Sequence, residues 1–374
     1  MDILFFSCLF AIGYAYIGYP LVLWMLSKKK SQSSSHAETR LPSIAIIIAG
    51  RNEAKVLPKK LENTLSLDYP AELKSIVVVS DGSEDDTEEV VRTFAEKGVK
   101  LIALKVRGGK EEAQKAGVAQ TDAEIIVFTD AKVTLDPQAL RLFAGYFADK
   151  EVGAVSSIDA VEGPGGEGLY VRYEMLLRRL ETQFRTVVGL SGSCFAVRSE
   201  LTKNMRANVC SDFSLMLQAA SQEYRGVLAE DIICRYRTVE TEKEEFPRKV
   251  RTVLRGISTF FACKEVLNPF RYGVFSWQIL SHKLFRWLVP VFFIFAFLLA
   301  VMKAPFSLFY AWYTLLTVLF VFFAIVGYRY PIFQKILPVR VGVFFCLSNA
   351  AILVAWWKYL RGERVVTWVP TERV

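Results

Sequence analysis

Residues 124–137 read EIIVFTDAKVTLDP, and this stretch holds the pattern that decides the fold. The apolar run Ile125–Phe128 is typical of a strand that is buried on both faces. It brings Asp130 to the end of that strand, and Lys132 follows two residues later. A carboxylate in this place is a candidate ligand-binding group. The lysine is a cation where a second carboxylate would be expected.

Three further apolar runs resemble this strand, and helical stretches separate them. The runs are Ile44–Ala49, Ser75–Val79 and Leu101–Leu104. The helical stretches are Leu57–Leu67, Asp86–Lys97 and Lys110–Gln120. This alternation predicts an α/β fold with a parallel sheet and helices on both faces. In such sheets, ligands bind beyond the carboxyl ends of the strands.

The composition indicates that part of the chain lies in lipid. Apolar residues make up 52% of the 374 residues, which include 28 Phe, and the net charge is +8. The basic residues concentrate beside apolar segments, which argues against nucleic-acid binding. The six cysteines are scattered without a CxxC pair, so we expect free thiols rather than disulfides or a zinc site. With only two histidines, carboxylates are the candidate acid–base groups.

The chain begins with an almost uncharged segment, Ile3–Leu26, and three lysines follow at 28–30. We interpret it as a spanning helix rather than a signal peptide, because the charges follow the apolar run and no small-residue cleavage site is apparent. The positive-inside rule then places the lysines in the cytoplasm and the N-terminus outside. Three more predicted spans lie toward the other end: Trp287–Met302, Leu308–Gly327 and Val341–Trp357.

These features predict five parts of the chain. They are a transmembrane helix at 1–27, a linker at 28–41, a cytoplasmic α/β domain at 42–241, amphipathic interfacial helices at 242–284 and a C-terminal membrane region at 285–374. Counting the spans places the C-terminus outside. Basic residues near that end favour the inside: Lys358, Arg361, Arg364 and Arg373. Either one segment is re-entrant or interfacial, or the charge rule fails here.

Polar residues follow each predicted strand of the α/β domain. The four motifs are GRNE with Glu53, SDGSEDDT with Asp81, RGGK with Lys110 and DAK with Asp130. Each motif alone has a structural explanation, because Ser and Asp cap helices and Gly-Gly forms turns. Four such motifs at successive strand ends predict instead a ligand site at one edge of the sheet.

The ordered set of motifs resembles membrane-bound family 2 glycosyltransferases of the GT-A fold, of the type that assembles polysaccharides and envelope glycans. The matching motifs are RNE at 51–53, DGSEDDT at 81–87, GK at 109–110, FTDA at 128–131, SDF at 211–213 and RKVRTVLRG at 248–256. With the flanking apolar segments, the resemblance covers nearly the whole chain. It implies a Rossmann-like, nucleotide-sugar-binding domain with one N-terminal and about three C-terminal transmembrane helices.

The resemblance also implies residues that bind the donor. Glu53 and Asp81 would hold the base and ribose of a nucleotide sugar, since carboxylates accept hydrogen bonds from N–H and O–H groups. Lys110 would meet the nucleotide or its diphosphate. Asp130 matches the first acid of a DxD-type motif, which holds a divalent cation (Mg²⁺ or Mn²⁺) on the diphosphate. Arg251 stands at the arginine of the family's QxxRW motif, where it would grip the diphosphate or else face lipid headgroups.

On the acceptor side, Asp212 matches the family's catalytic base. It would deprotonate an acceptor hydroxyl that displaces the nucleoside diphosphate, and the family leads us to expect inversion at the anomeric carbon. The alternative is a helix cap, because the helical run Phe213–Ala220 follows. Gly192 and Ser193, in the stretch LSGSCFAVR, resemble the acceptor-side loop, where a glycine lets the backbone approach a sugar.

Two positions depart from the family pattern. Lys132 stands where a second acid or an asparagine is usual, and Lys115 replaces a frequent asparagine. Both changes add positive charge near the expected phosphate site. Because a charged lysine cannot ligate a metal, the divalent cation is in doubt. Lys132 is a candidate either to neutralise the diphosphate directly or to point away from it.

The sequence thus predicts an inverting glycosyltransferase at the cytoplasmic face of a bacterial inner membrane. It would transfer a sugar from a nucleotide sugar, with a UDP-sugar as first choice, to a lipid-linked or growing glycan. One alternative is transfer to a polyprenyl phosphate, which needs no strong base. Another is a catalytically silent subunit of a polysaccharide synthase, suggested by Lys132 and Lys115. A glycan assembly system would also supply partner subunits.

Overall fold

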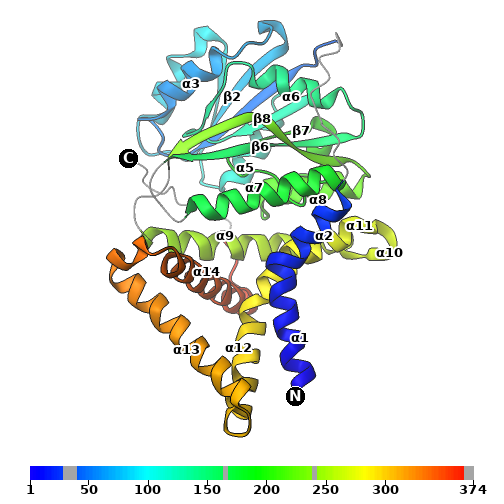
Figure 1. Cartoon of the computed structure of the whole chain (residues 1–374). Coiled ribbons are helices and arrows are strands. Elements are labelled where there is room, and N and C mark those ends of the chain that lie inside the picture. The colour runs from blue at the N-terminus through cyan, green and yellow to red at the C-terminus, as the bar shows by residue number, and fades with distance from the viewer. Residues whose placement is uncertain (28–39, 163–166, 238–241, 366–374) are drawn as a thin grey trace.

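The computed structural model describes residues 1–27, 40–162, 167–237 and 242–365. The first half of the α/β domain alternates strands and helices, as predicted (Figure 1). The strands are β1 (Ile44–Gly50), β2 (Lys74–Asp81), β3 (Val99–Leu104) and β4 (Ile125–Thr129). The helices between them are α3 (Leu57–Leu65), α4 (Thr87–Arg92) and α5 (Lys110–Val118). The predicted helix Asp86–Lys97 is instead α4 followed by a separate short turn, Ala95–Lys97.

The second half of the domain adds elements that the apolar runs did not reveal. The strands are β5 (Thr134–Leu135), β6 (Val152–Glu162), β7 (Cys194–Arg198) and β8 (Arg225–Arg237). The helices are α6 (Ala139–Phe147), α7 (Glu167–Phe184) and α8 (Ser211–Ser221). Only α8 coincides with a helix that the sequence indicated.

The eight strands found in the described ranges belong to one sheet, in the order β3-β2-β1-β4-β7-β6-β8-β5. β1 pairs in parallel with β2 and β4, and β2 pairs in parallel with β3. The rest of the sheet departs from the predicted parallel arrangement, because β7 runs antiparallel to β4 and β6, and β5 runs antiparallel to β8. The sheet is therefore mixed. An apolar run records how a strand is buried, and it does not record the direction of the neighbouring strand.

Helices cover both faces of the sheet, and β1 is buried along its whole length. Its side chains alternate between two apolar cores, as the period of a strand requires. Ile46 and Ile48 belong to the core under α3, α4 and α6. Ile47 and Ala49 belong to the core under α5 and α8. The predicted two-sided covering by helices is confirmed, and it leaves the ends of the strands as the place for a site.

Four helices in the described ranges are long and apolar enough to span a membrane, one N-terminal and three toward the C-terminus. They are Asp2–Leu26, which contains α1 (Asp2–Gly13) and α2 (Tyr19–Leu26); Val274–Phe306, which contains α11 (Val274–Ile279) and α12 (Arg286–Lys303); α13 (Leu308–Arg329); and α14 (Leu337–Leu360). The second helix begins before the predicted start at 285. Its first half contains the polar residues His282 and Arg286, and the sequence predicted residues 274–284 as part of the interfacial helices instead. In the fold, carboxylates of α7 meet both side chains.

The helix α9 (Glu242–Ala262) lies between the α/β domain and the apolar helices (Figure 1). It packs side by side with α14. Near one end, Lys249 Nζ lies 3.9 Å from the ring centre of Phe344. Near the other end, the ring centres of Phe261 and Tyr359 are 5.5 Å apart. Contacts at both ends mean that the two helices run alongside each other in the same direction.

Candidate active site

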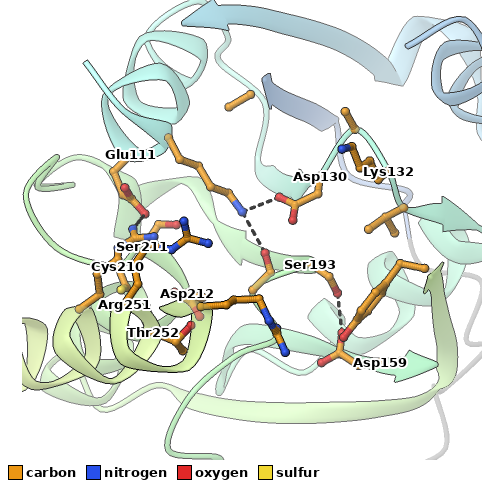
Figure 2. Close-up of a pocket in the computed structure, with 18 of the residues that line it drawn as sticks. Glu111, Asp130, Lys132, Asp159, Ser193, Cys210, Ser211, Asp212, Arg251 and Thr252 are labelled. Carbon is orange, nitrogen blue, oxygen red and sulfur yellow. Dashed lines mark hydrogen bonds and ion pairs between the residues drawn. The ribbon is translucent and has the colours of Figure 1, made fainter. Parts of the chain in front are cut away.

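A cavity of about 280 Å³ lies at the carboxyl ends of β1 and β4 (Figure 2). Its walls bring together eight residues that the sequence predicted as site residues: Glu53, Lys110, Asp130, Lys132, Gly192, Ser193, Asp212 and Arg251. They come from the loops after β1 and β4, the loop before β7, and the helices α5, α8 and α9. The site therefore depends on segments that lie far apart in the chain.

The ninth predicted residue, Asp81, does not line this cavity. Its carboxylate accepts hydrogen bonds from the backbone amides of Gly108 and Gly109, at 2.7 and 2.9 Å. Gly109 has a φ of 95°, a conformation that glycine adopts without the strain of a side chain. This turn starts α5 with Lys110 at its first position. Asp81 thus shapes the loop that presents Lys110.

The Lys110 ammonium joins two loops of the cavity. Its Nζ lies 2.5 Å from Asp130 Oδ1 and 3.0 Å from the carbonyl oxygen of Gly192. Burial alone would lower the pKa of Lys110, but the nearby carboxylates, Asp130 foremost and then Glu111 and Asp212, together outweigh burial and raise the pKa above its ordinary value. Lys110 is therefore charged at neutral pH, and it keeps a positive group at the centre of the cavity.

A buried lysine supports the loop that follows β4. Lys60 Nζ donates to Thr129 Oγ1 at 3.0 Å and to the carbonyl oxygen of Val133 at 2.8 Å, on either side of this loop. Burial lowers the pKa of Lys60 to about 8. At the cavity wall, Lys132 Nζ lies 3.7 Å from Glu53 Oε2. Burial raises the pKa of Glu53, and the charge of Lys132 partly opposes this effect.

Asp212 lies in the first turn of α8, where the capping position is occupied by Cys210 rather than by Asp212. Gly192 lies beside it, since a Cβ atom there would be 3.3 Å from Asp212 Oδ2. Glu53 and Asp130 each have a lysine partner. Within the described ranges, no hydrogen bond or ion pair engages the Asp212 carboxylate. This carboxylate is open to a substrate.

α9 forms the wall of the cavity toward the apolar helices. Arg248, Arg251, Thr252 and Arg255 line the cavity at a spacing that places them on one helix face. Arg255 is paired with Glu111, which follows Lys110 in α5 and is also buried at the cavity wall. Burial raises the pKa of Glu111, and the Arg255 charge partly opposes this effect. The wall is strongly basic and suits an anionic ligand.

Two acids of the cavity were missing from the predicted set. Glu111 resembled an ordinary acid in the first turn of a helix. Asp159 lines the cavity from β6 and accepts hydrogen bonds from the hydroxyls of Ser191 and Ser193. A lone acid in the apolar run VSSIDAV was its only signal in the sequence. Lys115, in contrast, is exposed on α5 and does not line the cavity, so its charge is not added to this site.

The described residues do not fit a metal centre held by the chain itself. They contain no group of three or more His, Cys, Asp or Glu residues placed to hold a metal ion. Asp130 is the candidate ligand, but the Lys110 ammonium contacts one of its oxygens. Lys132 stands at the place of a second ligand and is directed toward Glu53. Two ammonium groups therefore lie beside the carboxylates that would have to hold a cation.

Sequence comparison finds a family model that matches most of the α/β domain. Residues 45–206 match the family model "Glycosyl transferase family 2". Over 119 residues the chain is 29% identical to the poly-beta-1,6-N-acetyl-D-glucosamine synthase of Staphylococcus epidermidis. This match covers 31% of this chain and 28% of that protein. Over 158 residues it is 28% identical to the beta-monoglucosyldiacylglycerol synthase of Synechocystis sp. This second match covers 40% of this chain and 32% of that protein. The chain thus spans about three tenths of the length of these curated relatives.

A solved structure resembles the chain over almost its whole length. It is the mannosyltransferase PcManGT from Pyrobaculum calidifontis in complex with GDP-Man and Mn²⁺, with a TM-score of 0.75 and 22% identity over 96% of this chain and 99% of that one. At this identity the likeness establishes the fold alone. Residues 45–206 thus match glycosyltransferase family 2, and the GT-A fold of the chain continues into helices apolar enough to span a membrane.

Proposed function

We propose that this chain transfers a sugar from a nucleotide sugar to a hydroxyl of a lipid-linked or growing glycan, at the cytoplasmic face of the inner membrane. One observation carries the proposal. The open Asp212 carboxylate lies across the cavity from Asp130 and Lys132 (Figure 2). Displacement at an anomeric carbon requires a base on the attacking side and positive charge on the leaving side.

The donor would occupy the side of the cavity at the ends of β1 and β4. Glu53 would accept hydrogen bonds from the base or the ribose. Asp81 would contribute indirectly, because it holds the loop before Lys110 in place. Lys110, Lys132 and Arg251 would face the diphosphate. A UDP-sugar is the first donor to test, because the relative that makes poly-beta-1,6-N-acetyl-D-glucosamine belongs to polysaccharide synthesis.

The reaction would be a single displacement with inversion. The acceptor oxygen forms a bond to the anomeric carbon, and the bond from that carbon to the diphosphate oxygen breaks. The nucleoside diphosphate leaves with the electron pair, and the acceptor proton moves to Asp212. Gly192 and Ser193 lie beside Asp212 and line the cavity, so the acceptor sugar would rest against this loop.

We further propose that the lysines carry much of the charge that a divalent cation would otherwise supply. Lys110 is charged and sits on Asp130, and Lys132 stands at the position of the second ligand. Fixed positive groups can stabilise a leaving diphosphate by the same electrostatic means as a metal ion. The mannosyltransferase with the similar fold was solved with Mn²⁺, so a weak dependence on metal would mark a difference between the two proteins.

The place of the cavity supports an acceptor that arrives from the membrane. α9 lines the cavity with its arginines, and its other side packs against the apolar helix α14. The distance from the site to the apolar region is thus one helix diameter, on the order of 10 Å. A lipid-linked acceptor could enter along this wall with its anionic headgroup near the arginines.

The test is nucleotide release by the purified full-length protein in detergent, with and without chelator. UDP-, GDP- and dTDP-sugars would be offered together with a bacterial total lipid extract as the acceptor source. We expect release from one donor class, dependent on the extract and retained in large part after chelation.

Complete loss of release on chelation would contradict the role of the lysines and leave the transferase intact. Donor binding without release, with every donor and with the extract present, would contradict the transferase and favour a silent subunit.

A further inference from the structure

The loop Leu190–Ser193 touches the parts of the site that act on both substrates. The carbonyl oxygen of Gly192 accepts from Lys110, and that of Ser193 accepts from the Asp130 amide at 3.0 Å. The Leu190 amide donates to the carbonyl oxygen of Asp212 at 3.3 Å. A displacement of this loop would therefore shift the acceptor surface relative to both the base and the lysine.

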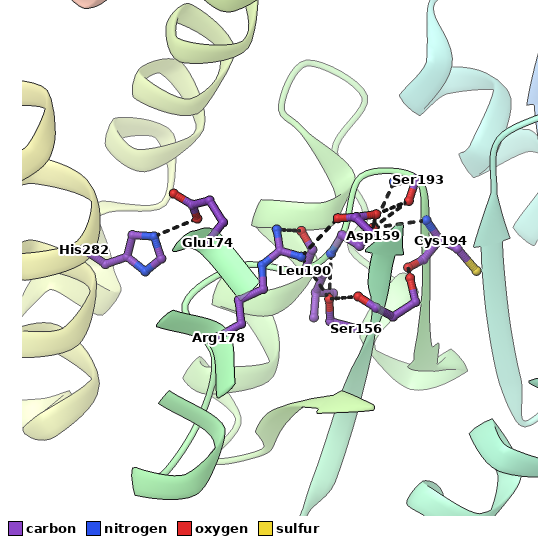
Figure 3. A network of polar contacts seen from close by, with 10 residues as sticks. Ser156, Asp159, Glu174, Arg178, Leu190, Ser193, Cys194 and His282 are labelled. Carbon is purple, nitrogen blue, oxygen red and sulfur yellow. Dashed lines mark hydrogen bonds and ion pairs between the residues drawn. The ribbon is translucent and has the colours of Figure 1, made fainter. Parts of the chain in front are cut away.

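A polar cluster that extends from the cavity wall to α7 holds this loop (Figure 3). Asp159 Oδ1 accepts from the hydroxyls of Ser191 at 2.6 Å and Ser193 at 2.5 Å. Asp159 Oδ2 lies 3.5 Å from Arg178 Nη1, and Arg178 Nη2 donates to the carbonyl oxygen of Leu190 at 3.2 Å. Asp159 thus holds the loop at Ser191 and Ser193, and Arg178 holds it at Leu190. Since Arg178 does not line the cavity, it can act on the reaction only through its neighbours.

The helix that carries Arg178 is itself anchored to the apolar helices. Glu174, Arg178 and Glu181 recur at the spacing of one face of α7. Glu181 Oε1 lies 2.6 Å from His282 Nδ1, and Glu174 Oε1 lies 2.5 Å from Arg286 Nη1. These four groups are almost completely buried. Although burial would raise the pKa of Glu174, Arg286 and His282 hold it well below its ordinary value.

We propose that Arg178 and Asp159 are positioning residues that set the loop Leu190–Ser193 against Asp212 and Lys110. α7 supplies the rigid support, because Glu174 and Glu181 fix it to the helix Val274–Phe306. The position of the acceptor surface is thereby fixed by the helices that face lipid as well as by the sheet. The expected effect of an Arg178 substitution on turnover rests on the proposed transferase function. The expected effect on the order of the loop does not depend on that function.

The chain offers a matched control on the same helix. Arg179, the next residue, is half exposed and forms an ion pair with Glu230 at 2.7 Å, away from the loop. Arg178→Gln and Arg179→Gln remove the same charge from adjacent positions of α7. Arg178→Lys keeps the charge but loses the guanidinium that reaches two partners at once.

The first measurement is hydrogen exchange of the full-length protein in detergent. In Arg178→Gln we expect faster exchange in peptides that cover 188–195, and unchanged exchange in peptides of α7 that cover 171–183. Arg179→Gln should match the wild type in both regions, and Arg178→Lys should fall between them. Unchanged exchange at 188–195 in Arg178→Gln would overturn the proposal.

The second measurement is nucleotide release with a bacterial total lipid extract as acceptor source. We expect Arg178→Gln to lower kcat by about 10- to 100-fold, with the donor Kd unchanged and with slow donor hydrolysis by water retained. Equal losses in transfer, hydrolysis and donor binding would show a general folding defect and would contradict a positioning role.

Two milder variants keep the proposal open to refutation if Arg178→Gln does not fold. Ser191→Ala and Ser193→Ala each remove one hydroxyl that donates to Asp159. Both should speed exchange at 188–195 and lower kcat in the same direction. If both variants match the wild type in exchange and in release, the cluster does not position the loop.

Discussion

Asp212 differs from its neighbours in the cavity at the scale of single residues. Among the described residues, Glu53, Glu111, Asp130 and Asp159 each form an ion pair, whereas Asp212 forms none and interacts with Lys110 and Arg255 only at longer range. A carboxylate held in an ion pair has part of its acceptor capacity occupied, whereas the Asp212 carboxylate is free to accept from a substrate in the cavity. By its position, Asp212 is therefore the carboxylate best placed to contact an acceptor hydroxyl.

We expect Asp212→Asn to retain donor binding and to lower kcat for sugar transfer by about 10²- to 10⁴-fold, the range of general base catalysis. Titration calorimetry with the donor and nucleotide release with lipid extract measure the two effects. Equal loss of binding and transfer would indicate a structural residue instead. Retained transfer would indicate a phosphate acceptor, which needs no strong base.

The pH dependence of donor binding tests Glu53. Its pKa is raised by burial, so its carboxylate becomes protonated at a higher pH than that of an ordinary glutamate. The protonated form loses acceptor capacity and no longer balances Lys132. We expect the donor Kd to rise as the pH falls from neutral toward the raised pKa. Glu53→Gln should bind about 10- to 100-fold more weakly and lack this acidic limb; an unchanged limb in the variant would assign it to another group.

Lys132→Asp tests how the diphosphate charge is met. The substitution restores a second acid near Asp130 and removes one cation from the cavity. Two carboxylates and a diphosphate would suit Mg²⁺ or Mn²⁺. We expect nucleotide release by the variant to depend on added metal more steeply than release by the wild type. The same metal response in both proteins would mean that Lys132 does not face the donor.

At the scale of elements, the packing of α5 controls where Lys110 lies. Gly117 lets this helix approach the sheet, since a Cβ there would lie 2.7 Å from Ile47 Cγ2 and 3.1 Å from Val79 Cγ2. Both neighbours are buried and branched at Cβ, so neither can turn aside easily. Added volume at this contact must move the helix or the strands.

We expect Gly117→Ala to destabilise the α/β domain. Overpacking costs about 1–3 kcal/mol, and the better helix propensity of alanine returns at most about 1 kcal/mol. Urea unfolding followed by fluorescence measures the difference. Lys115→Ala, an exposed change two residues away on the same helix, should stay within about 0.5 kcal/mol of the wild type. A stabilised Gly117→Ala would show that α5 can shift freely.

The elements that the sequence predicted best are those buried on both faces. β1 and β4 appear as continuous apolar runs because helices cover them on each side. β6 and β8 lack that pattern, since both strands mix polar with apolar side chains and are only partly buried along their length. Asp159 was missed for this reason, because its role depends on Ser191 and Arg178, which reach it only in the folded chain. The order of the motifs was enough to identify Lys110 and Asp212 as candidate site residues. The contacts that these two residues make became known only from the folded structure.

At the scale of the whole molecule, the apolar helices have two kinds of packing. The helix Asp2–Leu26 runs antiparallel to the helix Val274–Phe306, with Asp2 paired to Lys303 at one end and Tyr14 Oη 2.7 Å from Ser281 Oγ further along. These two helices extend away from the α/β domain, and the N-terminus lies at their far end (Figure 1). α14 instead lies along α9, the helix predicted to rest on the bilayer surface. Helices that run side by side share the same inclination to the membrane, so α14 would also lie near the surface.

The end of α14 gives a second reason to place it on the side of the α/β domain. Val365 packs with the core that contains Leu254 and Phe260 of α9. Arg364 and Val365 also line a small cavity together with Glu111 of α5. The chain thus returns to the α/β domain after α14. An interfacial α14 is one of the two ways to reconcile the count of spans with the basic C-terminal residues.

We therefore expect the two termini to lie on opposite sides of the membrane, with the C-terminus in the cytoplasm beside the α/β domain. Fusions to green fluorescent protein, which fluoresces only in the cytoplasm, and to alkaline phosphatase, which is active only outside, measure this. A fusion after Val374 should fluoresce and lack phosphatase activity. Truncated fusions after Phe306 and Tyr330 serve as controls, and they should report outside and inside, respectively. Phosphatase activity after Val374, with both controls as expected, would mean that α14 crosses the membrane and that the charge rule fails at this end of the chain.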